Sequence, residues 1–99
     1  MTTLVLEAEP LVVDVFIKDK NMTIKLNDGR TITVPLDWYP RLVHGTARER
    51  DNWQILGDGY AIEWPDLDEH IGIEGLLAGR RSGESSESFK RWLKSRSKE

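Results

Sequence analysis

The sequence contains no cysteine among its 99 residues. Disulfide bonds, thiolate zinc sites and cysteine nucleophiles are therefore excluded. Long apolar runs are also missing, since no segment approaches the roughly 18 apolar residues that a membrane-spanning helix needs. The opening MTTLVLEAEP includes two glutamates and no lysine or arginine, which is unlike a secretory signal peptide. We therefore expect a cytoplasmic protein with no membrane partner.

Catalytic signatures are scarce too. No serine, histidine and aspartate arrangement of a recognised kind is present, and GDGYAI at 57–62 is better explained by a hairpin turn than by a phosphate-binding loop. Asp66, Asp68 and His70 occupy alternate positions, where an extended chain would bring them to one side to bind a divalent metal. A turn in which the aspartates accept hydrogen bonds from backbone N–H groups explains the same residues. We expect no catalytic residue, metal or cofactor, and keep a metal-dependent enzyme as the last alternative.

Charge is divided unevenly along the chain, although the net charge is only −3. Residues 1–79 carry seven lysines and arginines against fourteen aspartates and glutamates, whereas residues 80–99 carry seven basic residues against three glutamates. An acidic body repels nucleic acid phosphates, and a basic tail attracts polyanions or acidic protein surfaces. The tail is therefore the segment whose charge suits a partner, and the acidic body of the same chain is one candidate.

Alternation of apolar and polar residues, with many β-branched side chains, predicts three successive strands in the first third of the chain. Directly opposed residues share a face of a sheet, so Ile24 is expected opposite Ile32. This pairing leaves a three-residue loop at 27–29 whose last position needs a left-handed residue, and a glycine occupies it. The predicted strands cover 11–17, 22–26 and 31–34 and form an antiparallel meander.

The segment WQILGDGYAIEW, residues 53–64, predicts a second hairpin. Opposing Ile55 to Ile62 leaves Asp58-Gly59 as a two-residue turn, and this pair tolerates the positive φ angles of a type I′ turn. The same register sets the two terminal tryptophans of the segment opposite each other. The proline that follows ends the second strand, because it has no N–H to donate.

Short helices are expected around these strands. Thr46 and Glu49 have the T-x-x-E spacing of a capping box, which predicts a helix over 47–52. Asp37 is expected to cap a further turn that contains Pro40. Later in the chain we expect a strand at 71–73, a helical turn at 76–79, a polar linker at 80–88 and a basic amphipathic helix at 89–99.

Two longer runs carry a resemblance to a known family. DGRTITVPLDWYPRL at 28–42 and ARERDNWQILGDGYAIEWPDLDEHIGIEGLLAG at 47–79 contain a DGR turn, a VPL-W-PRL element, an R-x-N-W element and a final GLL. As a set, over residues 11–79, these motifs resemble the domain of unknown function 2442 (DUF2442) family of small bacterial proteins. The resemblance implies an α+β domain with antiparallel sheet and short helices. This agrees with the meander, crossover helix and hairpin predicted above as a single domain over 1–79.

The resemblance implies little about chemistry, because the family has no established activity. Some relatives carry a C-terminal helix-turn-helix domain, for which the single helix predicted at 89–99 is too short. Members are also discussed as antitoxin-like partners of another small protein encoded beside them. The resemblance therefore implies a protein partner encoded by a neighbouring gene.

The aromatic and basic residues between 35 and 53 form a first candidate surface. They could stack on and clamp a nucleic acid strand. The alternative is architectural, with large aromatic side chains closing the core and the arginines solvated or paired with neighbouring acids. We favour the architectural interpretation because the body is acidic. The residues of this aromatic–basic cluster are Trp38, Tyr39, Arg41, Arg48 and Arg50.

The tail is the stronger candidate for a partner-binding element. Phe89, Trp92 and Leu93 have i, i+3 and i+4 spacing and would form an apolar stripe on one helical face. A helix of about a dozen residues is marginal alone and needs a surface to lie on. That surface is the chain's own body, a groove on a protein partner or second copy, or, with weak electrostatic support, a nucleic acid or membrane. The stripe is flanked by Lys90, Arg91, Lys94, Arg96 and Lys98.

The function that we expect is a non-enzymatic protein-binding or regulatory module. Its partner would be the small protein encoded next to it, or a second copy of the same chain. A nucleic-acid-associated transcriptional regulator is the alternative, which would use the tail together with the aromatic–basic cluster.

Overall fold

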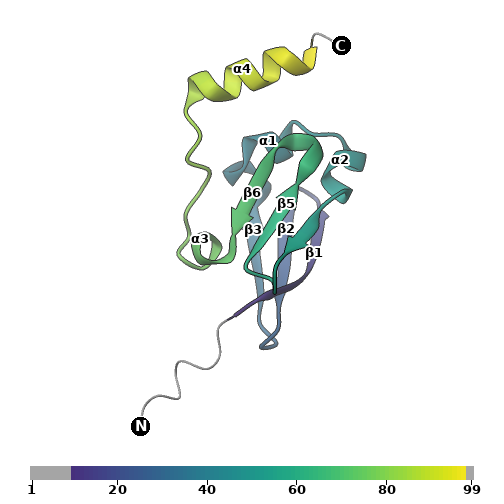
Figure 1. Cartoon of the computed structure of the whole chain (residues 1–99), viewed down its shortest axis with the longest axis vertical. Coiled ribbons are helices and arrows are strands. Elements are labelled where there is room, and N and C mark those ends of the chain that lie inside the picture. Colours follow the sequence, from purple (N-terminus) through teal and green to yellow (C-terminus); the bar gives the residue numbers. More distant parts are fainter. Residues whose placement is uncertain (1–9, 98–99) are drawn as a thin grey trace.

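Two three-stranded antiparallel sheets make up the body, and the apolar core includes residues of both. The structure, a computed structural model, describes residues 10–97. In Figure 1 the second sheet, β4-β5-β6, lies in front of the first, β1-β2-β3. The expected α+β class is confirmed. The strands are β1 (Val12–Lys18), β2 (Asn21–Leu26), β3 (Thr31–Pro35), β4 (Gln54–Leu56), β5 (Ala61–Trp64) and β6 (Glu69–Gly72).

Short helical segments connect the two sheets, join β5 to β6 and follow the second sheet. Two of them are single 3₁₀ turns, at Leu36–Trp38 and Pro65–Leu67. The second turn begins at the proline that was expected to end β5, so that prediction is confirmed. The α-helices are α1 (Pro40–Val43), α2 (Ala47–Asp51), α3 (Ile73–Leu77) and α4 (Ser86–Ser97).

The first sheet has the predicted pairing. Ile24 lies opposite Ile32, and the loop at 27–29 ends in a glycine with a φ angle of 94°. A bulge between Val12 and Asp14 shifts the register at the start of β1. Parity and turn chemistry were sufficient here, because both strands and their loop are neighbours in the sequence.

The second sheet keeps the predicted register, but the predicted two-residue turn is wrong. Ile55 lies opposite Ile62 as expected, yet residues 57–60 all belong to the loop. A 3.0 Å hydrogen bond from the N–H of Gly59 to the carbonyl of Leu56 closes the turn one position earlier than expected. Gly59 thereby becomes the last residue of the turn.

Gly59 has that position because it joins the two sheets. Its carbonyl accepts a 2.8 Å hydrogen bond from the N–H of Val12, and its φ angle is 119°. A Cβ atom at residue 59 would lie 2.6 Å from the Val12 carbonyl oxygen. The close approach of two distant strands therefore decides the turn geometry, and local turn preferences do not reveal it.

The two tryptophans at the ends of the hairpin segment do not form a pair in the ladder. The ladder between β4 and β5 ends at Gln54 and Glu63, one position short of them. Trp64 is fully buried and donates its indole N–H to the carbonyl of Arg50 at 3.0 Å. Trp53 is only half-buried and packs against the edge of the core. Trp64 thus ties α2 to the second sheet.

The core is formed by apolar side chains from both sheets and from the short helical segments. Large aliphatic residues dominate it, and no polar or charged residue is buried within the described part of the chain. Its most enclosed members are Trp64, Met22, Ile24, Leu42, Ile62 and Leu67.

The predicted capping box is confirmed at α2. The hydroxyl of Thr46 accepts the N–H of Glu49 at 3.1 Å, and the carboxylate of Glu49 accepts the N–H of Thr46 at 2.8 Å. The cap predicted at Asp37 is wrong, because that residue lies inside a 3₁₀ turn. Tyr39 is the N-cap of α1, but its side chain makes no capping hydrogen bond. Pro40 is the first residue of α1.

The last elements begin earlier than expected. Strand β6 covers 69–72 instead of 71–73, because Ile73 begins α3. Helix α4 begins at Ser86 instead of residue 89, and the Ser85 hydroxyl accepts the N–H of Ser88 at 3.1 Å in the manner of an N-cap. Helix α4 lies across the end of the body where α1 and α2 are found (Figure 1).

Parts of the predicted domain and tail fall outside the described residues, namely 1–9 and 98–99, including Lys98. Over residues 10–97, no helix is long and apolar enough to cross a membrane.

Gly59 provides a test of the junction between the sheets. We expect Gly59→Ala to lower the free energy of unfolding by more than about 3 kcal/mol, because the new Cβ overlaps the backbone of Val12 in addition to straining φ. Gly29→Ala is the matched control: it shares a positive φ, but nothing lies within 4 Å of its Cβ, so about 1–2 kcal/mol is expected. Urea unfolding measures both, and equal losses would contradict the close approach.

Candidate functional site: the tail–body interface

The aromatic–basic cluster and the tail, which the sequence suggested as two separate surfaces, meet in one interface. Residues from the 3₁₀ turn at Leu36–Trp38 and from α1 and α2 contact the segment from Arg80 onward, which runs back along the body to α4 (Figure 1). We call this contact the tail–body interface. Its body side comprises Trp38, Tyr39, Arg41, His44 and Glu49, and its tail side comprises Arg80, Arg81, Ser82, Glu84, Phe89, Trp92 and Arg96.

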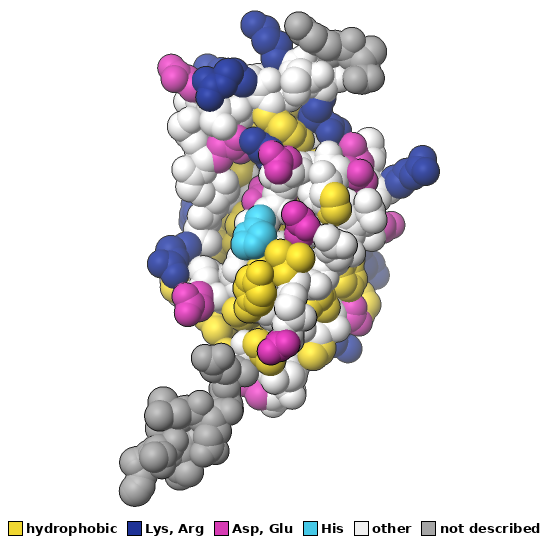
Figure 2. Space-filling view, in the orientation of Figure 1, with side chains coloured by type: hydrophobic (Ala, Val, Ile, Leu, Met, Phe, Trp, Pro, Cys, Tyr) yellow, Lys and Arg dark blue, Asp and Glu magenta, His cyan; other side chains and the backbone are white. Residues whose placement is uncertain are grey.

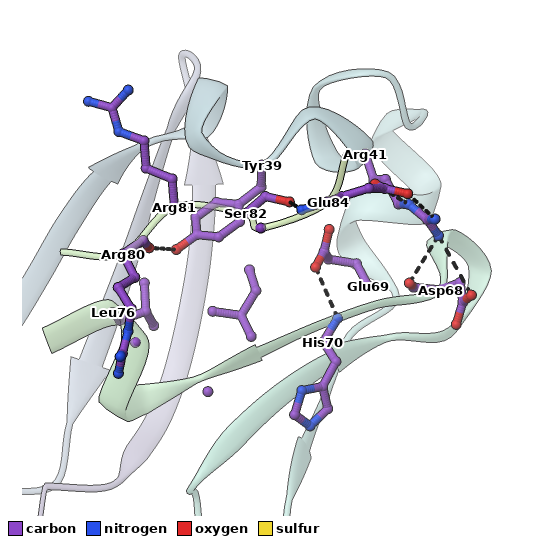
Figure 3. A pocket seen from close by; sticks show the side chains of 14 residues that line it. Tyr39, Arg41, Asp68, Glu69, His70, Leu76, Arg80, Arg81, Ser82 and Glu84 are labelled. Atoms are coloured by element: carbon purple, nitrogen blue, oxygen red, sulfur yellow. Dashed lines mark hydrogen bonds and ion pairs between the residues drawn. The ribbon is translucent and has the colours of Figure 1, made fainter. Parts of the chain in front are cut away.

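The linker between α3 and α4 is anchored by two aromatic residues of the cluster. Tyr39 is buried, and its hydroxyl donates to the carbonyl of Arg80 at 3.2 Å (Figure 3). Burial raises the pKa of Tyr39, with a smaller contribution from the charge of a nearby glutamate. The carbonyl of Trp38 accepts the N–H of Ser82 at 3.0 Å, and the guanidinium of Arg81 lies 5.2 Å from the indole centroid. The linker therefore has a defined path.

Arg41 holds the tail to the body. Its Nε donates to one carboxylate oxygen of Glu84 at 2.9 Å and its Nη2 donates to the other, while Nη1 donates to the carbonyls of Leu67 and Asp68 at 3.1 and 3.2 Å. The hydrogen bonds to Glu84 raise the pKa of Arg41, and those from Arg41 lower the pKa of Glu84. Both side chains are less than one-fifth exposed, so solvent screens this pair less than an ordinary surface pair.

Trp92 contacts two guanidinium groups. Arg41 of the body is 5.0 Å from the ring centroid, and Arg96 of the same helix is 4.8 Å from it. Phe89 stacks on Trp92 with centroids 5.7 Å apart, and its other neighbour is the ring of His44 at 5.3 Å. Cation–π contacts of this kind stabilise by about 0.5–1 kcal/mol each at exposed sites. Two residues of the predicted stripe thus rest on the body.

Glu49 connects the far end of α4 to α2. Its carboxylate accepts from Nη2 and Nη1 of Arg96 at 2.8 and 3.2 Å, while it also caps α2 at Thr46. The hydrogen bond from Arg96 is the largest cause that lowers the pKa of Glu49 to about 2, and the capping contact contributes further. One carboxylate therefore stabilises both the helix N-terminus and the docked tail.

The remaining predicted site residues either contact the body elsewhere or are exposed to solvent to different degrees. The guanidinium of Arg50 donates to the carbonyls of Leu42 and Gly45, so it closes the corner after α1. Arg48 is exposed. Leu93 of the stripe is half-buried, whereas Lys90, Arg91 and Lys94 are exposed along α4.

A cleft of about 470 Å³ lies beside the interface, between β6, α3 and the linker (Figure 3). Glu69 faces it, is partly buried, and accepts the N–H of His70 at 3.2 Å. Burial is the largest cause of a raised pKa at Glu69. Asp66 instead accepts from the side chain of Asn52 at 2.9 Å. Over residues 10–97 no three carboxylates or histidines come together as a metal site, so the grouping of Asp66 and Asp68 with His70 is not found.

Two acidic residues of the interface were missed at the sequence level. The sequence patterns place Glu49 in the capping box and beside the arginines of its own segment, and Glu84 in a polar linker, but they pair neither acid with an arginine from the other side of the interface. The signal that could have found them is charge complementarity, because both are acids that face arginines across the interface. Sequence separation hides such pairs.

Comparison with known proteins confirms the resemblance seen in the motifs. A family model described as protein of unknown function (DUF2442) matches residues 12–82. The chain is also similar to a crystal structure of a protein of unknown function from Rhodospirillum rubrum ATCC 11170, with a TM-score of 0.68 and 24% identity over 78% of this chain and 95% of that chain. Such a likeness shows the fold alone. No curated protein matches the sequence. Helix α4 lies beyond the residues that the family model matches.

The Glu49–Arg96 pair can be tested by titration. We expect the carboxyl of Glu49 to titrate at about 2 in the native chain and nearer its ordinary value of 4.5 in Arg96→Gln. Because the folded pKa is lowered, the pair stabilises the docked tail above pH 4.5, and this stabilisation is lost as the pH falls toward 2. Carboxyl ¹³C NMR measures both, and Asp28, which pairs with Arg30, is the internal control. An unchanged Glu49 titration in the variant would contradict the pair.

For Glu69 we expect a pH dependence of stability that is opposite in sign to that of the Glu49–Arg96 pair. Its raised pKa means that the folded state is penalised once the carboxyl ionises, so Glu69→Gln should raise the melting temperature by a few degrees at pH 7. The gain should shrink as the pH falls through the raised pKa toward 4.5, and it should vanish below 4.5, where the carboxyl is neutral in both the folded and the unfolded chain. Thermal melts across pH check this, with the exposed Glu74→Gln as the control. A gain that is independent of pH would count against the burial argument.

Proposed function

We propose that this chain, which belongs to the DUF2442 family of proteins of unknown function, is a protein-binding regulatory module. The observation that supports this proposal is the partial exposure of the apolar stripe. Phe89, Trp92 and Leu93 lie on a helix that is docked on the body, yet all three side chains remain partly exposed. Amphipathic helices with such aromatic anchors are a common means of protein recognition.

The charge of α4 favours an acidic protein surface as the partner. Lys90, Arg91 and Lys94 are exposed along the helix, and basic side chains project from α4 at one end of the molecule (Figure 2). Basic and aromatic residues together suit an interface whose rim is polar and whose centre is apolar. The stripe and its flanking cations are thus the residues that we assign to partner binding.

Nucleic acid is a weaker candidate for the same surface. Two of the arginines that could have faced phosphate are engaged, Arg41 by Glu84 and Arg50 by backbone carbonyls. Residues 1–79 also carry twice as many acidic as basic residues. Both features oppose the approach of a polyanion.

The partner that we propose is a small protein encoded beside this one, which the chain would hold and regulate in an antitoxin-like manner. Two observations support this partner. The family that matches residues 12–82 has no assigned activity, and the amphipathic helix α4 lies outside those residues.

Co-purification tests this function. Tagged full-length chain, produced in its native host, should capture the product of the neighbouring reading frame in stoichiometric amount. A double change of Arg91→Glu and Lys94→Glu should reduce capture at least tenfold, because it reverses the charge along α4 without touching the core.

The matched control reverses two exposed lysines on the first sheet, Lys18→Glu and Lys25→Glu, and should leave capture unchanged. Repeated failure to recover the neighbouring protein would refute the proposal. Recovery of nucleic acid alone, with an affinity that falls steeply as salt rises, would favour the alternative.

A further inference from the structure

Arg41, His44 and Glu49 of the body contact α4, and together they form what we call the helix seat. Arg41 and His44 belong to α1 and its C-cap, and Glu49 to α2. Two of the three are also held by contacts within the body. Arg41 binds the carbonyls of Leu67 and Asp68, and Glu49 is fixed by the capping box. These contacts of Arg41 and Glu49 do not involve the tail.

The tail matches the seat residue by residue. Phe89 lies on His44, Trp92 lies on Arg41, and Arg96 pairs with Glu49. The spacing of Phe89, Trp92 and Arg96 is i, i+3 and i+7, which places them on one helical face. The helix seat therefore binds a helix with two aromatic residues and one arginine at i, i+3 and i+7.

These contacts suit a reversible interaction. The Arg96–Glu49 pair is about one-quarter exposed on both sides, and exposed or partly exposed pairs add little stability. Of the three stripe residues, only Trp92 packs against the core. A helix of 12 residues is marginal in water without such support, so α4 owes its stability to the seat.

We propose that the helix seat is a recognition surface for a helix of the pattern aromatic, aromatic, arginine, and that α4 occupies it in cis until a partner's helix of that pattern displaces it. This inference goes beyond the proposed function, since it assigns the body surface beneath α4, and not α4 itself, to a partner's helix. Helix α4 is then a built-in competitor, which lies outside the family domain and sets a threshold for partner binding.

A labelled peptide of residues 84–97 is the probe, because it carries the matching pattern. Native full-length chain should bind it weakly, since its seat is filled. The full-length Trp92→Ala chain keeps the seat but loses the central contact of its own helix, so it should bind the peptide at least tenfold more tightly in fluorescence anisotropy. Equal affinities of the two chains would overturn the proposal.

A charge exchange identifies the seat. Adding Glu49→Arg to the Trp92→Ala chain should abolish peptide binding, and a peptide with Arg96→Glu should restore it, which also shows that the variant is folded. If the exchanged peptide failed to restore binding, the peptide would bind outside the helix seat and the proposal would be overturned.

Hydrogen–deuterium exchange gives a second readout on the native chain. Excess unlabelled peptide should accelerate exchange of the α4 amides and leave those of β2 unchanged. Unaltered α4 exchange at saturating peptide would exclude displacement. These experiments use no cellular partner, so a negative result overturns the seat alone, whereas a negative co-purification overturns the proposed function.

Discussion

The guanidinium of Arg41 joins three parts of the chain that are distant in sequence. From α1 it binds the two carbonyls that precede β6, the carboxylate of Glu84 in the linker and the face of Trp92 in α4. Planar geometry makes this possible, because the donors of an arginine point in several directions in one plane while its face remains open for stacking. Without this side chain the linker and the helix would lose their main common support.

Body and tail are stabilised by different physical terms. The two sheets bury large aliphatic side chains and Trp64 against each other, and such burial tolerates changes of salt and pH. The tail is held mainly by ion pairs, hydrogen bonds and cation–π contacts, which respond to both. The protein therefore combines a domain of fixed structure with an appended helix whose docking depends on charge, a combination suited to regulated binding.

Local patterns predicted much of the fold. Parity placed Ile24 opposite Ile32 and Ile55 opposite Ile62, and the capping box at Thr46 began α2 as expected. Two of the failures share one cause. The turn before β5 was misplaced because Gly59 must meet β1, and the tryptophan pair was not found in the ladder because Trp64 bonds to the end of α2. In both cases a contact between distant segments overrode a local preference.

The sequence alone determined which residues have the chemistry for binding: an aromatic–basic cluster and an amphipathic basic helix, with no catalytic signature beside them. Only the tertiary structure decided that these are two sides of one interface, with Glu49 and Glu84 as the acids that complete it. The reason is physical. Periodicity and capping depend on neighbours within a few residues, whereas an ion pair depends on where the whole chain brings its charges, and Arg41 and Glu84 stand 43 residues apart.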